Sequence, residues 1–473
     1  MRHPARHRLQ RQVESLRQEY LQDGPLPLTD VLTEEGLKEA LHQIKAPWKD
    51  RIFTPLVTLW VFLGQVLAAD PSCRAAVARL IAHRLARRLK PCSSETGGDC
   101  QARARLPERF FSAIARLVGR RLDERVDPQW LWKGRRIDLF DGSTVAMPDT
   151  PENRAEYPLT YNQAPGTCFP VARIGAIISL SCGAILNLGV CRYAGKGQGE
   201  VSLLRRLWDA LHAGDVLLGD RLMSNWAGIH GLQQRGVDLV SRLNKAVRRA
   251  DFRKGIRLGQ DDHLVVWKKP TSIRSVDRAT YRALPDSIVV REVRFRVEQP
   301  GFRTRSIVVV TTLLDPEETT VEDLAALYRA RWNNELDLRS IKITLQMDML
   351  RCKTPELVRK EIWTHVLAYN LIRTVMAQAA AAHGMAPRSI SFKGTLQILE
   401  AFRPVIAYQE DRGPVHREEL YRQLLQAIAA QRVGDRPDRF EPRMTKRRPK
   451  GYPRLRRPRP EIKREILKRS RKV

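Results

Sequence analysis

The chain has 473 residues and a mass of 54.2 kDa, which is roughly two to three typical domains and enough to bury a large core. Hydrophobic residues make up 43% and charged residues 29%, a composition that excludes wholesale disorder. The 83 Lys and Arg outnumber the 52 Asp and Glu by 31, and the pI is about 10.5. This excess predicts a polyanionic partner, nucleic acid first and an anionic membrane surface second, with a merely soluble basic surface as the alternative.

The sequence shows no stretch that predicts a membrane span or a secretion signal. The best candidate, residues 52–69, is interrupted by Pro55, Gly64 and Gln65, whereas a spanning helix needs about 20 apolar residues. The basic residues 1–7 are not followed by an apolar run and a small-residue cleavage site. The seven cysteines include no C-x-x-C pair. We therefore expect reduced thiols and a cytoplasmic protein without a membrane role.

The first part of the chain, residues 31–122, has the periodicity of helices. Helices are expected to begin near Thr33 and to cover residues 52–67 and 73–89. Residues 91–100 predict a loop because they are rich in Ser and Gly. Cys92 and Cys100 in this loop suggest a metal clip, but without a second Cys/His pair nearby two ordinary thiols are the favoured interpretation.

From about residue 135 to residue 244, strands and helices alternate. The expected strands cover residues 136–140, 171–180, 184–190, 216–219 and 237–242, with helices at 201–211 and from about Ser224. This order predicts a mixed α/β core. Residues 195–199 are rich in glycine but lack the spacing of a nucleotide fingerprint, which favours a flexible loop.

Beyond residue 245 a segment of strands with period-two alternation indicates a β-rich insertion. Its expected strands cover residues 263–268, 287–297 and 304–312. Helix returns from Val321, and a long amphipathic helix opened by Pro355 is expected at residues 356–382. Residues 443–472 hold 15 Lys and Arg against two Glu and contain four prolines, which predicts a basic arm.

Two aspartates follow short apolar runs. Asp141 comes directly after residues 137–140, and Asp220 comes directly after residues 216–219. A carboxylate at the end of a buried strand is costly unless a cation compensates it. For either aspartate alone, a solvated turn is an equally good interpretation.

A third acid, Glu335, belongs to a spaced set of four residues. Tyr328, Arg331, Glu335 and Lys342 stand at offsets 0, 3, 7 and 14. On one continuous helix these offsets share a narrow face. An acid flanked by Arg, Lys and Tyr can ligate a metal while its neighbours hold phosphate oxygens. A salt-bridged, solvated helix face is the alternative.

The pattern Y-(2)-R-(3)-E-(6)-K resembles the signature of the insertion-sequence-four group of bacterial DDE transposases. The D-G-S-T and P-D-T runs at residues 141–150 are similar to the first-aspartate segment of that group, and residues 214–221 are similar to the second. The two aspartates are 79 residues apart, and 115 residues separate Asp220 from Glu335, which leaves room for the β-rich insertion of the group. The resemblance extends from about residue 31 into the basic tail.

The resemblance implies an α/β (α+β) fold with a ribonuclease-H-like catalytic core, a β-rich insertion, a helical N-terminal region and a basic C-terminal arm. The implied domains are a helical DNA-binding region at 1–125, the first part of the core at 126–244, the insertion at 245–318, the second part of the core with the glutamate helix at 319–432, and the arm at 433–473.

The resemblance also implies that Asp141, Asp220 and Glu335 hold two divalent metal ions, Mg²⁺ by preference with Mn²⁺ as a substitute. Two hard cations roughly 3.5–4 Å apart activate the attacking hydroxyl and stabilise the leaving oxygen of a phosphodiester. The expected DNA contacts are Tyr328, Arg331, Lys342, Trp267, Trp332, Arg221, Arg447 and Arg448. Either Trp is a candidate to hold a flipped base, and structural packing is the alternative for each.

The implied function is cut-and-paste transposition of an insertion sequence by phosphodiester hydrolysis and strand transfer, through a hairpin intermediate. The implied partners are double-stranded DNA, as terminal inverted repeats and target, and a second copy of the chain in a synaptic complex. The helix at 356–382 is a candidate dimer interface, and the location is the bacterial cytoplasm, at the nucleoid when bound to DNA. The alternatives are a metal-dependent nuclease without strand transfer and a non-catalytic DNA-binding protein descended from a transposase.

Overall fold

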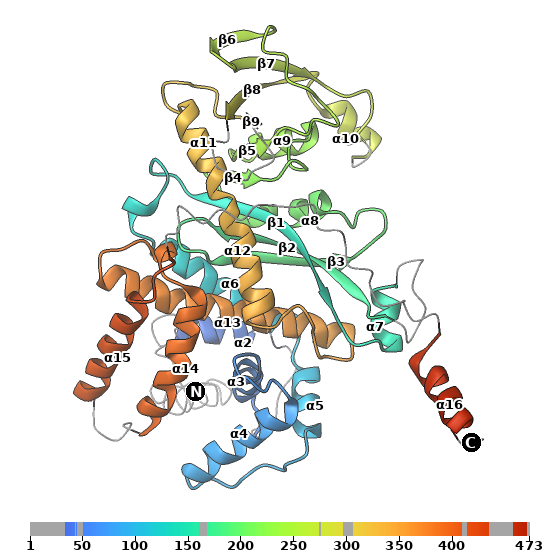
Figure 1. The fold of residues 1–473 in the computed structure, drawn as a ribbon, viewed down its shortest axis with the longest axis vertical. Coiled ribbons are helices and arrows are strands. Elements are labelled where there is room, and N and C mark those ends of the chain that lie inside the picture. The colour runs from blue at the N-terminus through green and yellow to red at the C-terminus, as the bar shows by residue number, and fades with distance from the viewer. Residues whose placement is uncertain are drawn as a thin grey trace, which may run out of the picture. The chain divides into compact units, whose positions relative to one another are not determined.

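The computed structural model describes residues 34–42, 44, 51–159, 168–273, 276–296, 306–408, 414–434 and 457–470 (Figure 1). The chain divides into two units, which we describe separately. The helical unit comprises Met1–Trp130, Ser181–Leu186 and Asp337–Val433, and the sheet unit comprises Leu131–Leu180, Asn187–Leu336 and Gly434–Val473. Among the helices in the described ranges, none has the length and apolarity that a membrane span requires.

The helical unit is built from helices of the N-terminal region and of the second half of the chain. They are α2 (Glu34–His42), α3 (Pro55–Val66), α4 (Cys73–Ala86), α5 (Gly97–Arg105), α6 (Glu108–Glu124), α13 (Pro355–Ala382), α14 (Phe392–Tyr408) and α15 (Pro414–Ala429), with short turns η2 (Pro128–Trp130), η4 (Ser340–Thr344) and η5 (Pro387–Ser389). The predictions for α3, α4 and α13 are confirmed to within a few residues. The loop prediction for 91–100 is wrong at its end, because α5 begins at Gly97 and places Asp99 in its first turn.

The long helix α13 is the centre of the helical unit, where it packs against α3, α6, α14 and α15 (Figure 1). Twenty of its 28 residues are buried. Asn370 in its middle donates hydrogen bonds to the carbonyls of Ala115 (3.0 Å) and Ile185 (2.9 Å) and accepts one from the Ile185 N–H (2.8 Å). The interpretation of this helix as a dimer interface is therefore wrong, because its own chain covers it.

A buried ion cluster lies beside α13. The Asp337 carboxylate is 1% exposed and accepts hydrogen bonds from Arg388 (2.7 Å), from the Tyr369 hydroxyl (3.0 Å) and from Arg373. A buried carboxylate is tolerated only when it is paired and hydrogen-bonded in this way. The cluster joins the last residues of helix α12 (Trp332–Arg339) to α13 and to the η5 turn. Nothing in the sequence pattern predicted it.

The sheet unit carries most of a nine-stranded sheet with the order β3-β2-β1-β4-β5-β9-β8-β7-β6. The strands are β1 (Ile137–Ala146), β2 (Val171–Ser179), β3 (Ile185–Arg192), β4 (Val216–Gly219), β5 (Asp238–Arg242), β6 (Ile256–Gly259), β7 (Asp262–Lys268), β8 (Ser287–Arg296) and β9 (Ser306–Thr311). Strands β1, β4 and β5 are parallel, and β4 is buried along its whole length, as its unbroken apolar run requires. The prediction of a mixed α/β protein is confirmed.

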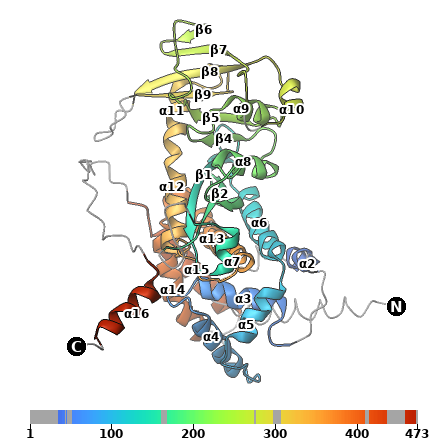
Figure 2. The same ribbon diagram turned by 90° about the vertical axis from the view of Figure 1, so that its right-hand side faces the viewer.

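Strands β6 to β9 continue the same sheet beyond β5 rather than forming a separate one (Figure 2). Each pairs with its neighbour in the antiparallel sense, and β9 pairs with β5 through Val240, Ser241 and Arg242. Helices of the sheet unit are α7 (Pro151–Glu156), α8 (Glu200–Leu207), η3 (Trp208–Ala210), α9 (Trp226–Gln233), α10 (Arg278–Ala283), α11 (Val321–Ala330) and α16 (Arg459–Ser470). The short elements β6 and α10 were not predicted.

Candidate active site in the sheet unit

Asp141 lies within a strand and not at its end, which corrects the sequence prediction. Strand β1 continues to Ala146 because β2 pairs with it throughout, and Asp141 stands opposite Ala176. The parallel partner β4 ends earlier, with Leu139 opposite Leu218 as the last pair. Asp141 is therefore the second residue beyond the parallel pairing, and one edge of its strand is free at this point.

Asp220 follows β4 at the matching position of the neighbouring strand. Continuing the register of β1 and β4 by two residues brings Asp220 level with Asp141. The carboxylate of Asp220 accepts a hydrogen bond from the Leu222 N–H (2.8 Å), and its carbonyl accepts one from the Ser241 hydroxyl (2.5 Å). The carbonyl bond fixes the backbone of Asp220 to β5. Arg221, the next residue, is exposed.

Arg331 connects the third acid to the first. Its Nη2 atom lies 3.1 Å from Glu335 Oε1, and its Nη1 atom lies 3.9 Å from Asp141 Oδ2. Because Arg331 and Glu335 stand four residues apart on helical backbone, their side chains meet on one face. Three acids far apart in sequence are thus brought together: two at matching positions just beyond the parallel pairing of β1 and β4, and the third through a shared arginine.

The buried setting of Asp141 changes its acidity. Burial raises the pKa of the Asp141 carboxyl from 3.8 to about 6, and the charges of Asp220 and Glu200 add to the increase. The Gly142 N–H and the Arg331 guanidinium act in the opposite direction but do not cancel it. The charged form of the Asp141 carboxyl is therefore disfavoured in this buried setting.

The four spaced residues do not share one continuous α-helix, so the single-face prediction is wrong in detail. Helix α11 ends before Arg331, where the Arg331 N–H bonds to Tyr328 (3.2 Å) and the Asn334 N–H bonds to Arg331 (3.0 Å), both in tight three-residue turns. Lys342 lies in the π-helical turn η4, which has more residues per turn than an α-helix, and it belongs to the helical unit. Tyr328, Arg331 and Glu335 remain together in the sheet unit.

Tyr328 is nearly buried, with 8% of its surface exposed, and its ring lies 6.4 Å from that of Phe295. Burial raises the pKa of the Tyr328 hydroxyl, although Arg331 and Arg242 oppose the increase. The hydroxyl is therefore protonated at neutral pH and is able to donate a hydrogen bond.

The two candidate tryptophans, Trp267 and Trp332, differ in how far their side chains are exposed. Trp267 on β7 is 3% exposed; its indole N–H donates to Glu292 (2.9 Å), and the guanidinium of Arg248 lies 4.4 Å from the ring centroid. Trp332 is 47% exposed. The geometry therefore favours structural packing for Trp267 and leaves the ring of Trp332 accessible. Arg447 and Arg448 lie outside the described residues.

Comparison with known proteins decides the class. Residues 132–371, just over half of the chain and including all three acids, match the transposase DDE domain family. The chain belongs to this family. It is 28% identical to the transposase InsG for insertion sequence element IS4 of Escherichia coli (strain K12) over 368 residues, 75% of this chain and 77% of that protein. The resemblance to the insertion-sequence-four group is thereby confirmed.

Two further similarities are weaker. The chain is 38% identical to the transposase for insertion sequence element IS421 of Escherichia coli over 69 residues, 15% of this chain and 19% of that protein. Among solved structures, the piggyBac transposase synaptic complex with hairpin DNA is similar over 86% of this chain and 84% of that chain, with a TM-score of 0.40 and 7% identity.

Sequence reasoning about this DDE transposase missed a fourth acid at the site. Glu200, the first residue of α8, lies so close to β1 that a Cβ on Gly142 would come within 2.6 Å of its side chain. Glu200 forms an ion pair with Arg173 on β2 (3.0 Å). The glycine after Asp141 was the available signal, since it leaves room for this side chain.

The donor set of the DDE transposase fits a hard divalent cation. Asp141, Asp220 and Glu335 offer carboxylate oxygens, the ligands that Mg²⁺ and Mn²⁺ prefer. Within the described part of the chain, these oxygens do not all lie within 4.8 Å of one another, and the Arg331 guanidinium contacts two of the three carboxylates. The raised pKa of Asp141, about 6, is the mark of a carboxylate that gains from an added cation.

The contrast between the tryptophans predicts opposite behaviour on substitution. Trp267→Ala is expected to lower the free energy of unfolding by about 3–5 kcal/mol, because it empties a buried site and removes the indole N–H that donates to Glu292 Oε1. Trp332→Ala is expected to change it by less than about 0.5 kcal/mol, because the ring is exposed. Urea unfolding of the two variants beside the parent chain measures both values. Equal falls in the free energy of unfolding for the two variants would contradict the prediction that only Trp267 is buried.

Proposed function

We propose that this DNA transposase moves an insertion sequence by a cut-and-paste mechanism, with Asp141, Asp220 and Glu335 holding two Mg²⁺ ions. The observation that carries the proposal is the grouping of the three acids: Asp141 and Asp220 at matching positions just beyond the parallel pairing of β1 and β4, with Arg331 in contact with both Asp141 and Glu335. A nuclease without strand transfer and a non-catalytic DNA-binding relic are the competing functions.

A ribonuclease-H-like core is part of the same proposal. The order β3-β2-β1-β4-β5, with β1 antiparallel to β2 and parallel to β4, supports this architecture. In it, acids at the ends of the central strands meet an acid from a helix. The five-part division of the chain at residues 125, 244, 318 and 432 belongs to the proposal too, with β6 to β9 forming the insertion.

The residues of the site have distinct roles in this proposal. When bound, the two cations activate the attacking hydroxyl and stabilise the leaving oxygen of the phosphodiester. Arg331, which contacts Asp141 and Glu335, would hold a phosphate oxygen, for which its fork of donors is suited. Tyr328 donates its proton in a hydrogen bond to a neighbouring phosphate. Lys342 and Arg221 add positive charge along the DNA backbone.

The hairpin intermediate asks for a base to be taken from the stack and held against an aromatic ring. We propose Trp332 for this role, because its ring is exposed and it follows Arg331 directly, whereas Trp267 is enclosed. We further propose that the helices before residue 125 recognise the terminal inverted repeats and that two copies of the chain act together on two ends. The bacterial cytoplasm, at the nucleoid, is the proposed location.

The test is cleavage of a supercoiled plasmid that carries the flanking repeats of the gene. With Mg²⁺ or Mn²⁺ the chain is expected to cut at the repeat ends, to give hairpin ends and to join them to a second plasmid. EDTA is expected to stop every step. Cuts without joining would support the nuclease, and tight binding without cuts would support the DNA-binding relic.

The basic arm offers a separate prediction. Deletion of residues 443–473 is expected to weaken binding to all DNA sequences alike and to flatten the dependence of affinity on salt. A shortened chain that contacts fewer phosphates releases fewer counterions when it binds DNA. Titrations of repeat and unrelated DNA at several salt concentrations measure both effects. An unchanged salt slope would show that the arm does not contact the DNA backbone.

A further inference from the structure

A cluster of thiols lies in the helical unit, apart from the residues assigned to DNA chemistry. Cys73, Asp99 and Cys100 each place one donor atom, a sulfur or a carboxylate oxygen, so that the three atoms lie within 4.8 Å of one another. The sequence had suggested Cys92 and Cys100 as a pair, but the fold brings Cys100 to Cys73, 27 residues earlier. Such a long-range pairing is not visible in local spacing.

The three donors stand at the starts of two helices. Cys73 is the first residue of α4, and Asp99 and Cys100 lie in the first turn of α5. Unpaired backbone N–H groups at a helix start favour negative charge, which helps a thiol to lose its proton. Helix α5 begins with two glycines and has no side-chain cap, so it lacks the usual means of fixing its first turn.

Charge around the cluster also suits a divalent cation. Asp99 is fully buried and is paired with Arg103 at 3.0 Å and 2.5 Å, so these two charges cancel. Two thiolates would then balance one ion of charge +2.

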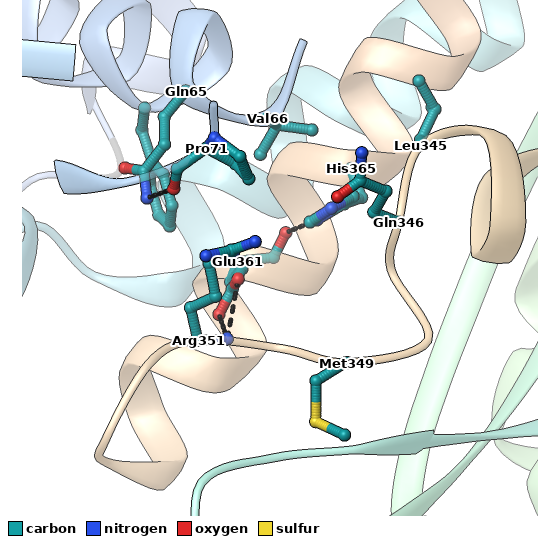
Figure 3. Close-up of a pocket in the computed structure, with 10 residues that line it drawn as sticks. Gln65, Val66, Pro71, Leu345, Gln346, Met349, Arg351, Glu361 and His365 are labelled. Atoms are coloured by element: carbon teal, nitrogen blue, oxygen red, sulfur yellow. Dashed lines mark hydrogen bonds between the residues drawn. The ribbon is translucent and has the colours of Figure 1, made fainter. Parts of the chain in front are cut away.

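The Gln65 side chain contacts Cys73. The Gln65 amide donates to the Pro71 carbonyl (2.7 Å) and lies 3.8 Å from the Cys73 sulfur. Gln65 and Pro71 also line a cavity of about 10 Å³, room for about one water molecule (Figure 3). The Glu361 carboxylate, which also lines that cavity, accepts hydrogen bonds from the backbone N–H of Arg351 (3.0 Å).

We propose that Cys73, Cys100 and Asp99 bind one zinc ion that fastens the start of α5 to the start of α4. Binding releases the two thiol protons to solvent and forms two zinc–sulfur bonds and one zinc–oxygen bond, with water in the fourth position. Tetrahedral bonds of about 2.3 Å place two sulfur ligands roughly 3.8 Å apart, so the cluster needs to contract only slightly. Zinc suits this mixed sulfur and oxygen set better than Mg²⁺ does.

The experiment uses the full chain, purified with a phosphine reductant and stripped of metal, and titrates it with Co²⁺ as the probe. The expected result is a thiolate-to-cobalt charge-transfer band that saturates at about one thiolate-bound Co²⁺ per chain and that added Zn²⁺ removes. Cys73→Ser and Cys100→Ser are each expected to weaken binding at least about tenfold and to reduce the band. Cys168→Ser, a cysteine of the sheet unit, is the matched control and is expected to behave like the parent chain.

Two outcomes would overturn the proposal. One is a parent chain without the charge-transfer band, or with a band that survives both serine variants. The other is a Cys73–Cys100 disulfide, found by peptide mapping, in chain that binds no metal after reduction. Cys100 is exposed, so its serine variant is expected to keep the parent circular dichroism, which separates loss of ligand from loss of fold. The readouts do not involve DNA, so the result is independent of the proposed function.

Discussion

Glu335→Gln is expected to lower metal-dependent cleavage at the repeat ends by about 10³-fold or more, equivalent to about 4 kcal/mol of transition-state stabilisation. The amide keeps the size of the side chain but removes the charge that a divalent cation needs. Affinity for the repeat DNA is expected to stay close to that of the parent chain, since Arg331 and the basic surface remain. Gel-shift and plasmid cleavage assays on the same preparation measure the two properties.

A matched control for this substitution lies on the preceding helix. Glu322 on α11 is exposed and lies outside the site, so Glu322→Gln should cleave like the parent chain. If Glu335→Gln also cleaves normally, the third acid has been assigned wrongly. If both variants lose cleavage, the loss comes from a general fall in charge or stability.

Asp141→Asn is expected to stabilise the metal-free chain at neutral pH while abolishing cleavage. Burial raises the pKa of the folded-state carboxyl from 3.8 to about 6, so folding disfavours the charged form. The folded chain therefore loses stability as the pH rises through this window, and above it the full cost is present. We expect a gain of about 1–3 kcal/mol in the variant, because Arg331 and partial exposure moderate the cost.

Thermal or urea unfolding in EDTA between pH 4 and pH 8 checks this expectation. The difference between the variant and the parent should be small near pH 4 and should grow to a plateau above about pH 6 to 7. Asp209→Asn is the control, because the side chain of Asp209 is 93% exposed and carries no burial cost. Addition of Mg²⁺ should stabilise the parent and not the variant. A variant less stable than the parent at pH 8 would contradict the assigned environment.

The sequence predicted the candidate acids because each has a local signature. Asp141 and Asp220 follow apolar runs, and Glu335 stands at helical spacing from Arg331. Glu200 was missed because its approach to Gly142 depends on where α8 begins after the glycine-rich loop, which no local pattern records. The buried carboxylate of Asp337 was missed for the same reason, since its partners come from two later elements.

The prediction that Tyr328, Arg331, Glu335 and Lys342 share one helix face was wrong because it assumed an uninterrupted α-helix. The tight turn at Arg331 and the π-helical turn around Lys342 both change the angle per residue, and neither has a glycine or proline to mark it. The sequence pattern also did not predict which of the two tryptophan side chains, Trp267 or Trp332, is exposed. That difference depends on Glu292 and Arg248, which reach Trp267 from other segments.

The hydrogen-bonded junction between β5 and β9 has a consequence for how such a chain can vary. Ser241 on β5 supports the backbone of Asp220 and is itself paired with Val310 on β9. Loss of the whole insertion would leave β5 as a bare edge, open to pairing with other chains and less able to hold that aspartate. Changes at β6, the outermost strand, would leave the junction intact. Insertions and deletions are therefore best tolerated near β6, at the outer edge of the sheet. Transposases of related insertion sequences can differ there while the residues of the active site stay the same.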